Sequence, residues 1–459
     1  MIKFERLPYS VRWLMAAGMG LRLSAGRYGK EFSEFSIFLA NSTQFSHSQQ
    51  TAWQKAELLR LVESAASGTV HYNKLGPDPA LDLESLVSEL PILEKQQLRS
   101  APEQFFNRNV KKWLVTATSG TSGSPMKVEH SKFSTQRRFA LLKQHLELAG
   151  VSKNAPSVRL SGRIIAKPSC KVRRPWLFVP TENQLLLSSY HLNADHQAVI
   201  ANKLSQFAPE VMDGYSSGVL ETLRLMQRAG VKLHSLKAIV TTAETLSPAV
   251  REELEALSGA KVLDYYAASE GVPIIQQCQF GTYHVRWESG IFEVLSDDKA
   301  SFEGDGELVV TSLTQDRTPL IRYRTGDYVK GLRTRDQAVC ECGLRTPTIE
   351  SVEGRIEDMV LVRGGKRMGM FSYRTLKEVA GLHEAQVVQR DYDDFCVRAV
   401  LVPGAERGLV SAAVHDKFER VLGYPIKLDF HVLEEIPKGA NGKLRLVVNE
   451  MLRKDGSQT

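Results

Sequence analysis

Residues 116–125 read TATSGTSGSP and directly follow the apolar, β-branched run WLVTA at 113–117. The glycines allow the backbone to turn tightly, and the hydroxyls and exposed N–H groups of such a loop can hold phosphate oxygens. The loop is not a Walker motif, because the chain contains no Gly-Lys pair followed by Ser or Thr. By itself the segment also fits an ordinary flexible turn, so its meaning depends on the segments around it.

Four more segments follow this loop in a fixed order: YYAASEG at 265–271, PLIRYRTGDYV at 319–329, GRIEDMVLVRGG at 354–365 and IPKGANGKLR at 436–445. Together the five segments resemble the adenylate-forming superfamily of acyl-CoA synthetases and adenylation domains. The resemblance is strongest to the phenylacetate-CoA ligase-like branch with its capsule-biosynthesis relatives. It covers about residues 110–450, and residues 7–32 also look like the start of the capsule-associated members.

The sequence pattern that indicates helices or strands changes along the chain. Residues 1–110 are predicted to form a helical segment packed on the body of the protein. From about residue 113 to 310, short β-branched runs alternate with helical stretches, which is typical of an α/β domain with a largely parallel sheet. We therefore predict an ATP- and acid-binding α/β body at 111–353, strand-rich near 291–350, and a small α+β lid at 354–459. The resemblance implies the same plan: a multi-layer body with mixed or parallel sheets and a mobile C-terminal domain.

Composition sets broad limits. The chain has 459 residues, 42% of them hydrophobic and 24% charged, with a net charge of +7, which fits a soluble protein of several domains. This charge does not imply nucleic-acid binding. Five cysteines are too few for a disulfide scaffold and fit a reducing compartment, so a cytoplasmic location is expected. The stretch at 11–23 is too short to span a bilayer; it is expected to be a packed amphipathic helix, with peripheral membrane contact as the open alternative.

The resemblance implies a two-step reaction. A carboxylic acid reacts with ATP and Mg²⁺ to give an acyl-adenylate and pyrophosphate, and a nucleophile then takes the acyl group. Coenzyme A is the expected acceptor, and an amine in polysaccharide or natural-product assembly is the alternative. The expected wall of the acid pocket, at 209–219 and 238–244, contains Tyr215 and Met212 and fits an aryl or medium-sized acid. The sequence does not show which acid binds, nor the oligomeric state.

The same resemblance assigns ATP-binding residues. The β- and γ-phosphates are expected at Ser119, Gly120, Thr121, Ser122 and Gly123. Many relatives have a lysine directly after the proline of this loop, whereas here Met126 takes that place and Lys127 follows. We therefore expect a weakened contact to the ATP phosphates.

Three short segments supply the other expected contacts. The adenine is expected at Ala243, at Glu244 and at the stacking ring of Tyr266. The α-phosphate is expected at Ser269, and the ribose at Asp327. Glu270 is expected to be catalytic as the carboxylate near Mg²⁺, a cation that prefers oxygen ligands. The alternatives are a surface acid for Glu270 and an ordinary turn residue for Asp327.

The last expected site residues belong to the C-terminal part. Arg355 is expected to contact phosphate, and Glu357 occupies the hinge position, where relatives usually have Asp or Lys. Lys443 is the expected catalytic cation, because an ammonium there would stabilise the charge that develops as pyrophosphate leaves. Rotation of the lid would then remove Lys443 and present the loop near Gly364 to the acceptor thiol.

Cysteine and histidine spacing predicts a metal site. Cys340 and Cys342 form C-x-C-G, and Cys278 and His284 form C-x5-H, so together they could make a closed structural Zn²⁺ site. Some phenylacetate-ligase-like proteins carry a similar Cys/His set. The alternative is that Cys278 and His284 are unrelated to the pair. Cys170 and Cys396 are expected to be buried thiols, and they are left out of the site.

The sequence also leaves two other functions open. Residues 214–218, GYSSG, satisfy the G-x-S-x-G pattern of a serine hydrolase with Ser216 as nucleophile. The preceding residues, 208–213, look like a poor strand, so a helix start capped by Ser216 or Ser217 is the plainer interpretation. A non-enzymatic assembly protein that keeps the fold is the other alternative. It would predict degenerate nucleotide-binding residues, whereas Glu270, Asp327, Arg355 and Lys443 are all present.

Overall fold

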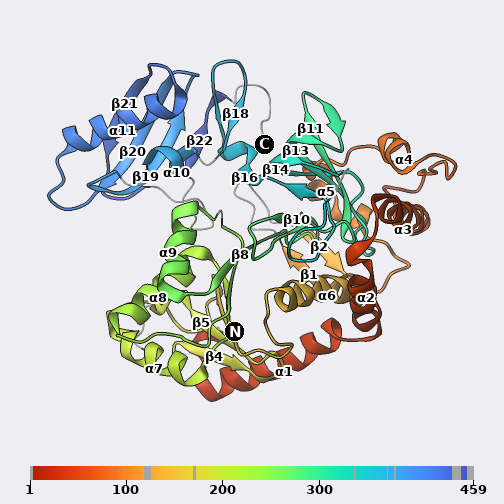
Figure 1. Ribbon diagram of the computed structural model, residues 1–459, viewed down its shortest axis with the longest axis horizontal. Helices are drawn as coiled ribbons and strands as arrows, with labels where there is room; N and C mark the ends of the chain where they lie inside the picture. The colour runs from red at the N-terminus through yellow and green to blue at the C-terminus, as the bar shows by residue number, and fades with distance from the viewer. Residues whose placement is uncertain are drawn as a thin grey trace.

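The computed structural model describes residues 4–117, 126–168, 172–244, 246–334, 338–369, 371–376, 379–436 and 446–451. The N-terminal part contains α1 (Tyr9–Arg27), α2 (Lys30–Asn41), α3 (His47–Gly68), α4 (Leu83–Glu89) and α5 (Lys95–Ser100). Helix α3 begins at a capping box, in which the Ser46 hydroxyl accepts from the Gln49 N–H and the Gln49 side chain accepts from the Ser46 N–H. Figure 1 shows α1 along the lower edge of the molecule and α3 and α4 on the right.

The larger sheet has nine strands in the order β15-β10-β9-β8-β7-β6-β3-β5-β4. They are β3 (Ser157–Ser161), β4 (Trp176–Val179), β5 (Gln184–Ser188), β6 (Val211–Gly214), β7 (Ala238–Thr241), β8 (Lys261–Ala267), β9 (Ile274–Gln277), β10 (Tyr283–Val285) and β15 (Thr348–Ile349). Strands β5, β3, β6, β7 and β8 run parallel, and antiparallel strands complete both edges. The expected α/β fold with a largely parallel sheet is confirmed.

Helices cover both faces of this sheet. They are α6 (Lys132–Leu148), α7 (Gln197–Phe207), α8 (Ser216–Arg228) and α9 (Pro248–Ser258). On one face Leu160, Met212 and Ile239 pack with α7, α8 and α9, and on the other Val240 and Leu263 pack near the end of α6. Because both faces are covered, β7 is buried along its whole length, whereas β3, β6 and β8 each also carry at least one charged residue. Met212 is fully buried in this core and does not line an acid pocket.

A second, five-stranded antiparallel sheet has the order β12-β11-β13-β14-β16. Its strands are β11 (Gly290–Ser296), β12 (Lys299–Ser301), β13 (Gly304–Ser312), β14 (Tyr323–Leu332) and β16 (Ser351–Arg355). One hydrophobic cluster joins this sheet to the N-terminal helices through Leu58, Leu86 and Leu98, all fully buried. A hairpin of β1 (Leu114–Ala117) and β2 (Lys127–His130) flanks the loop at 118–125, which lies outside the described residues.

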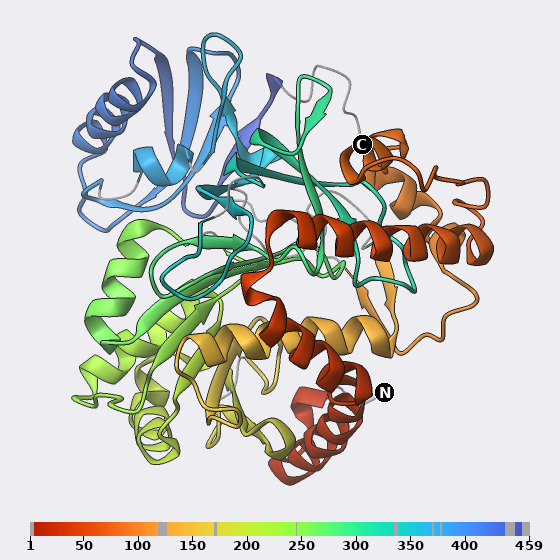
Figure 2. The same cartoon turned by 45° about the vertical axis from the view of Figure 1, so that its right-hand side comes forward.

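The C-terminal part has its own sheet and core (Figure 2). Its elements are β17 (Val360–Leu361), β18 (Arg367–Met368), α10 (Phe371–Leu376), β19 (Leu382–Gln389), β20 (Asp394–Leu401), α11 (Arg407–Leu422), β21 (Lys427–Val432) and β22 (Val447–Asn449). The sheet has the order β21-β20-β19-β22 and encloses a cluster of rings from Phe371, Phe395 and Phe418. Strand β22 was not expected from the sequence; it pairs parallel with β19.

The junction between the body and this C-terminal domain falls at a strand end. β16 pairs with β14 in a register that sets Arg355 opposite Asp327, and a short 3-10 helix, η7 (Ile356–Asp358), follows. The expected boundary between residues 353 and 354 therefore cuts a strand of the body sheet. We propose that the body ends at Arg355.

Among the described residues, no helix is long and apolar enough to cross a bilayer.

Candidate active site

Three neighbouring parallel strands end at the same edge of the large sheet. Tyr215 follows β6, Ala243 and Glu244 follow β7, and Glu270 comes shortly after β8. In open α/β sheets, ligands bind outside the carboxyl ends of the strands. Residues that the sequence places far apart thus come together at the edge where such a fold binds its ligand.

Glu244 lies against the start of α8. Its carboxylate accepts hydrogen bonds from the Ser216 hydroxyl at 3.0 Å, the Ser217 hydroxyl at 2.9 Å and the Ser217 backbone N–H at 2.9 Å. An acid at this place complements the positive end of the helix dipole. The helix is capped by Glu244, and the expectation that a serine caps it is wrong.

The same geometry bears on the hydrolase alternative. Residues 211–214 do form a strand, β6, and Gly214 turns with φ +140°, so the poor strand expected from the proline and acids is wrong. However, the Ser216 hydroxyl donates to a carboxylate, whereas a nucleophile elbow requires a histidine base. The strand-turn-helix context alone does not make Ser216 a nucleophile.

Glu270 is buried, and groups from distant parts of the chain surround its carboxylate. Tyr323 of β14 donates its hydroxyl to Oε1 at 3.1 Å, and the Lys95 ammonium of α5 lies 3.7 Å from Oε1. Burial, followed by the Glu270 charge, raises the pKa of Tyr323, so its hydroxyl keeps its proton. The Glu270 carboxylate is thus buried and fixed by its neighbours, so Glu270 is not a surface acid.

The buried carboxylate of Asp327 is the centre of a second cluster beside the first. Its carboxylate accepts from the Tyr266 hydroxyl at 2.5 Å and pairs with the Arg355 guanidinium at 2.8 Å. The Asp327 charge raises the pKa of Arg355, and burial with Asp327 raises the pKa of Tyr266. The structure therefore brings together three residues that the sequence assigned to nucleotide binding.

Lys95 links the two acids. Burial and the Arg355 charge lower the pKa of Lys95, and the charges of Glu270 and Asp327 oppose that shift. Its ammonium also donates to the Thr325 carbonyl at 3.3 Å. The Lys95 ammonium thus balances part of the negative charge of the two carboxylates.

A hydrogen-bond network fixes the segment that carries Glu270. His130 contacts the Thr116 hydroxyl through Nε2 at 2.7 Å and the Gln315 amide through Nδ1 at 2.8 Å. Thr116 donates to the Ser269 carbonyl at 2.8 Å, and Gln315 donates to the Glu270 carbonyl at 2.9 Å. Burial, with a smaller effect of Arg138, lowers the pKa of His130 to about 3, so the ring is neutral. A proton on Nε2 satisfies every contact, because Nδ1 then accepts from Gln315.

Some of the expected site residues fall outside the described part of the chain. These are Ser119, Gly120, Thr121, Ser122 and Gly123 of the glycine-rich loop, Lys443 and the thiol Cys170. The hairpin ends that flank the loop are described, and Thr116 joins one of them to the Glu270 segment. Ser269 lies between Tyr266 and Glu270 in sequence. Glu357 lies in η7, the 3-10 helix that begins after Arg355.

Four residues of this site had no role in the sequence assignment. Tyr323 lies inside the RYRTGD segment and could have been found there, because it is four residues before Asp327. Lys95, His130 and Gln315 carried no local signal, since each approaches Glu270 through the tertiary fold. Met126, at the usual lysine position, is buried, and Lys127 is exposed.

A Cys/His cluster lies at the other edge of the large sheet. The ligand atoms of Cys278, His284, Cys340 and Cys342 all lie within 4.8 Å of one another. Two tight turns present the thiols, because the Gly281 N–H donates to the Cys278 carbonyl and the Gly343 N–H to the Cys340 carbonyl. Both glycines have positive φ, which a side chain would disfavour.

The spacing of this cluster matches one tetrahedral ion. The sulfurs of Cys278 and Cys340 lie 3.9 Å apart, and the Cys342 sulfur lies 3.3 Å from Nε2 of His284. Zn–S bonds of about 2.3 Å in a tetrahedral site put two sulfurs about 3.8 Å apart. The Nδ1 atom of His284 contacts the Thr346 hydroxyl at 2.7 Å, which orients Nε2 toward the cluster. The predicted Cys3His set is therefore brought together.

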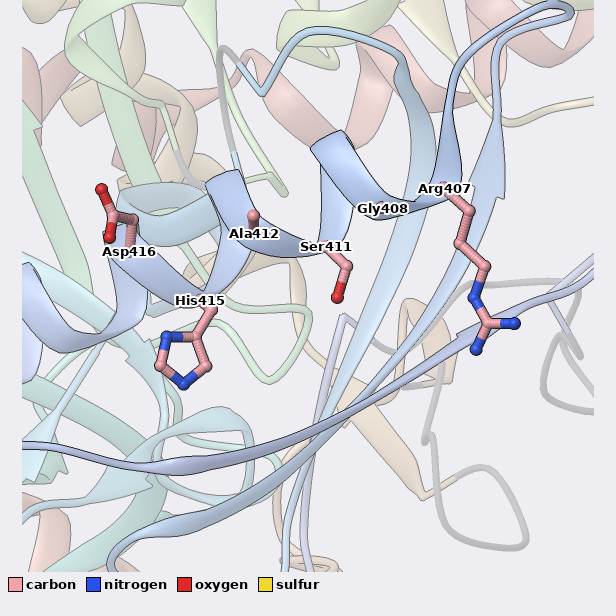
Figure 3. Close-up of a pocket in the computed structure, with 6 residues that line it drawn as sticks. All are labelled: Arg407, Gly408, Ser411, Ala412, His415 and Asp416. Carbon is pink, nitrogen blue, oxygen red and sulfur yellow. The ribbon is translucent and has the colours of Figure 1, made fainter.

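A surface hollow lies elsewhere, on α11 of the C-terminal domain. It is lined by Arg407, Gly408, Ser411, Ala412, His415 and Asp416. Figure 3 shows Arg407, Ser411 and His415 along one side of the helix. None of these residues belongs to the clusters described above, so this hollow is not part of the candidate site.

Known proteins are similar to this chain in sequence. The family model described as the CapK C-terminal domain matches residues 364–450. Protein CapK of Staphylococcus aureus is 26% identical over 80% of this chain and 80% of its own length. A phenylacetate-coenzyme A ligase of Thermus thermophilus is 26% identical over 68% of this chain and 72% of its own length. The chain is a homologue of CapK and of the phenylacetate-CoA ligases.

A solved structure extends the likeness to the whole fold. A 2-hydroxyisobutyryl-CoA ligase, crystallised in the postadenylation state with 2-HIB-AMP, superposes with a TM-score of 0.63 over 90% of this chain and 93% of its own, at 17% identity. The expected adenylate-forming fold, with its C-terminal domain, is confirmed. The expected relationship to CoA ligases is also confirmed. CoA ligases are enzymes, so this relationship counts against the non-enzymatic alternative.

Proposed function

We propose that this protein activates a carboxylic acid with ATP as an acyl-adenylate and then transfers the acyl group to an acceptor. The observation that supports this most directly is the convergence of Glu270, Asp327 and Arg355, from three separate motifs, at the carboxyl edge of the parallel sheet. Burying the two carboxylates costs free energy unless cations compensate, and Lys95 and Arg355 supply that compensation.

Each residue has a role in this proposal. Asp327 accepts hydrogen bonds from the ribose hydroxyls, and Tyr266, whose hydroxyl it now holds, presents its ring to adenine. Ala243 and Glu244 contact the adenine edge from the end of β7. Arg355 neutralises phosphate. Its guanidinium pairs with Asp327, and its side chain is half exposed and so remains accessible to a ligand. Ser269 contacts the α-phosphate, and the loop at 119–123 contacts the other two.

Magnesium fits the donors at Glu270. The carboxylate is buried and offers oxygen, the ligand that Mg²⁺ prefers. When bound, Mg²⁺ supplies charge neutralisation between the phosphates. Glu270 holds that charge in place, and Tyr323 fixes its carboxylate by the hydrogen bond to Oε1.

Coenzyme A is the proposed acceptor, because CoA ligases occur among both the homologues and the structural neighbours. Pyrophosphate release should be measured over a panel of carboxylic acids without acceptor, with CoA and with amines. Under the proposal, at least one acid supports release, and CoA increases turnover with formation of a thioester. Faster turnover with an amine, and amide formation, would assign the acceptor to the amine class instead. No release with any acid would contradict the proposed activation step.

Lys95 is proposed to contact ATP phosphate in place of the loop lysine that this chain lacks. Lys95→Met keeps the aliphatic stem and removes the ammonium, so KM for MgATP should rise about tenfold or more, as expected for a lost hydrogen bond to a charged group. Lys127→Met is the matched control, because Lys127 is next to the usual position but its side chain is exposed. Steady-state kinetics on both variants decides which lysine serves. A large rise for Lys127→Met with none for Lys95→Met would overturn this assignment.

We also propose a structural Zn²⁺ at Cys278, His284, Cys340 and Cys342. Purified protein should contain about one zinc ion per chain, and Cys342→Ser should lose it and melt several degrees lower, because the metal joins the β9–β10 turn to the 340–344 turn. Cys396→Ser is the control, because Cys396 is a free, buried thiol in β20, away from the cluster. Metal analysis and thermal melts give the answer. Full zinc content in Cys342→Ser would show that this cysteine is not a ligand.

A further inference from the structure

Helix α1 turns its apolar side chains outward. Leu14 is 67% exposed, Met15 51% and Met19 53%, and Val11 and Leu21 are exposed as well. At 100° per residue, positions 11, 14, 15, 18, 19 and 22 share one face of a helix, and 21 lies beside it. Contiguous apolar surface of this kind is uncommon on a soluble monomer and marks an interaction site. We call these five side chains the α1 apolar face.

The inward side of α1 explains why the helix does not simply bury that face. Arg12 is buried, and its guanidinium donates to the carbonyls of Leu7 and Ile165. Gly20 lies where the side chains of Val179 and Thr181 approach so closely that a Cβ would clash. A glycine and an anchored arginine thus fix the helix orientation, with its apolar face held toward solvent.

Several cations lie around the α1 apolar face, and Glu182, which also contacts α1, is paired with Arg27. Between Glu5 and Glu31 the chain contains no acid, and Arg22 lies on the exposed face itself. The loop that Arg12 contacts carries exposed Arg163, Lys167 and Arg173, and Arg174 lies 4.8 Å from the Tyr9 ring of α1. Ile164 of this loop is also 45% exposed. Apolar side chains bordered by cations complement a surface that is apolar inside and anionic outside.

We propose that α1 and the exposed cations Arg163, Lys167, Arg173 and Arg174 dock this protein on an anionic lipid bilayer, with α1 lying in the plane of the interface. Apolar side chains enter the acyl boundary while arginine and lysine remain at headgroup level. Figure 1 shows α1 at the periphery of the fold, on the side away from the C-terminal domain. Docking would therefore leave that domain facing the solvent.

Sedimentation with vesicles tests this proposal. Full-length protein should bind vesicles made of equal parts of phosphatidylcholine and phosphatidylglycerol, bind pure phosphatidylcholine vesicles far less, and detach at high salt. Leu14→Gln, Met15→Gln and Met19→Gln combined should weaken binding at least about tenfold. Leu409→Gln, which changes an equally exposed leucine on α11, should bind as the wild type does.

A second variant keeps the test independent of helix folding. Lys167→Gln with Arg173→Gln leaves α1 intact and should weaken binding about fivefold per charge removed. Equal binding to neutral and anionic vesicles, wild-type binding by the triple variant, or no vesicle binding by the wild type would each overturn the proposal. A dimer in light scattering that the triple variant abolishes, without vesicle binding, would assign the face to a second copy instead.

Discussion

Replacement of Lys443 by alanine should slow carboxylate-dependent pyrophosphate release about 100- to 1,000-fold. The expected cause is the loss of one preorganised positive group aimed at the oxygens where charge develops as pyrophosphate leaves. Substrate binding should change less, because the proposed contact strengthens in the transition state, so kcat falls more than KM rises. Steady-state pyrophosphate assays on both proteins measure the split.

Two controls make the Lys443 result specific. Lys427→Ala removes an exposed lysine of β21 in the same domain and should leave both steps unchanged. Transfer from a supplied acyl-adenylate to the acceptor should proceed at nearly the wild-type rate in Lys443→Ala, because the proposed lid rotation about Glu357 removes Lys443 before that step. If pyrophosphate release by Lys443→Ala matched the wild type, the assigned mechanism would be wrong.

Replacement of Glu270 by glutamine should lower kcat/KM for MgATP about 100-fold, or about 2.7 kcal/mol. The amide can still accept from Tyr323 but carries no charge to hold Mg²⁺ or to balance Lys95. A higher Mg²⁺ concentration should restore part of the activity. That recovery would not be seen if Glu270 only supported the fold.

Tyr323→Phe is the matched variant for Glu270→Gln. It deletes the hydrogen bond to Oε1 and leaves the carboxylate, so we expect a loss of only about fivefold to tenfold, with an ordinary Mg²⁺ dependence. A larger effect in Tyr323→Phe than in Glu270→Gln would contradict the magnesium role. Melting curves for both variants separate loss of fold from loss of metal.

Local patterns made much of the fold predictable. The β-branched runs near Ala238 and Lys261 form central parallel strands because both faces of these strands are covered by helices. The strand at 211–214 forms despite the residues that argued against it, since Pro209 and Glu210 precede it and Asp213, inside it, pairs with Arg159. Strand β22 was missed because it is a three-residue strand that forms only by pairing with β19.

The site was predictable where contacts are carried by motifs. Asp327 and Arg355 lie in two motifs that β14 and β16 pair directly, and the Cys/His set comes from two short turns. Lys95 and His130 were not predictable, because they reach Glu270 from helices and strands more than a hundred residues away. The packed helix expected at 11–23 forms, but its apolar face points outward, since the buried Arg12 and Gly20 occupy its inner side.

The most direct test of the account is exchange of labelled pyrophosphate into ATP, with and without a carboxylic acid and with no acceptor present. The account predicts exchange that requires both an acid and Mg²⁺, because acyl-adenylate formation is reversible while the acceptor is missing. It also predicts that Lys443→Ala abolishes most of that exchange. Exchange without any acid, or none across a broad acid panel in well-folded protein, would contradict the central claim that this site forms acyl-adenylates.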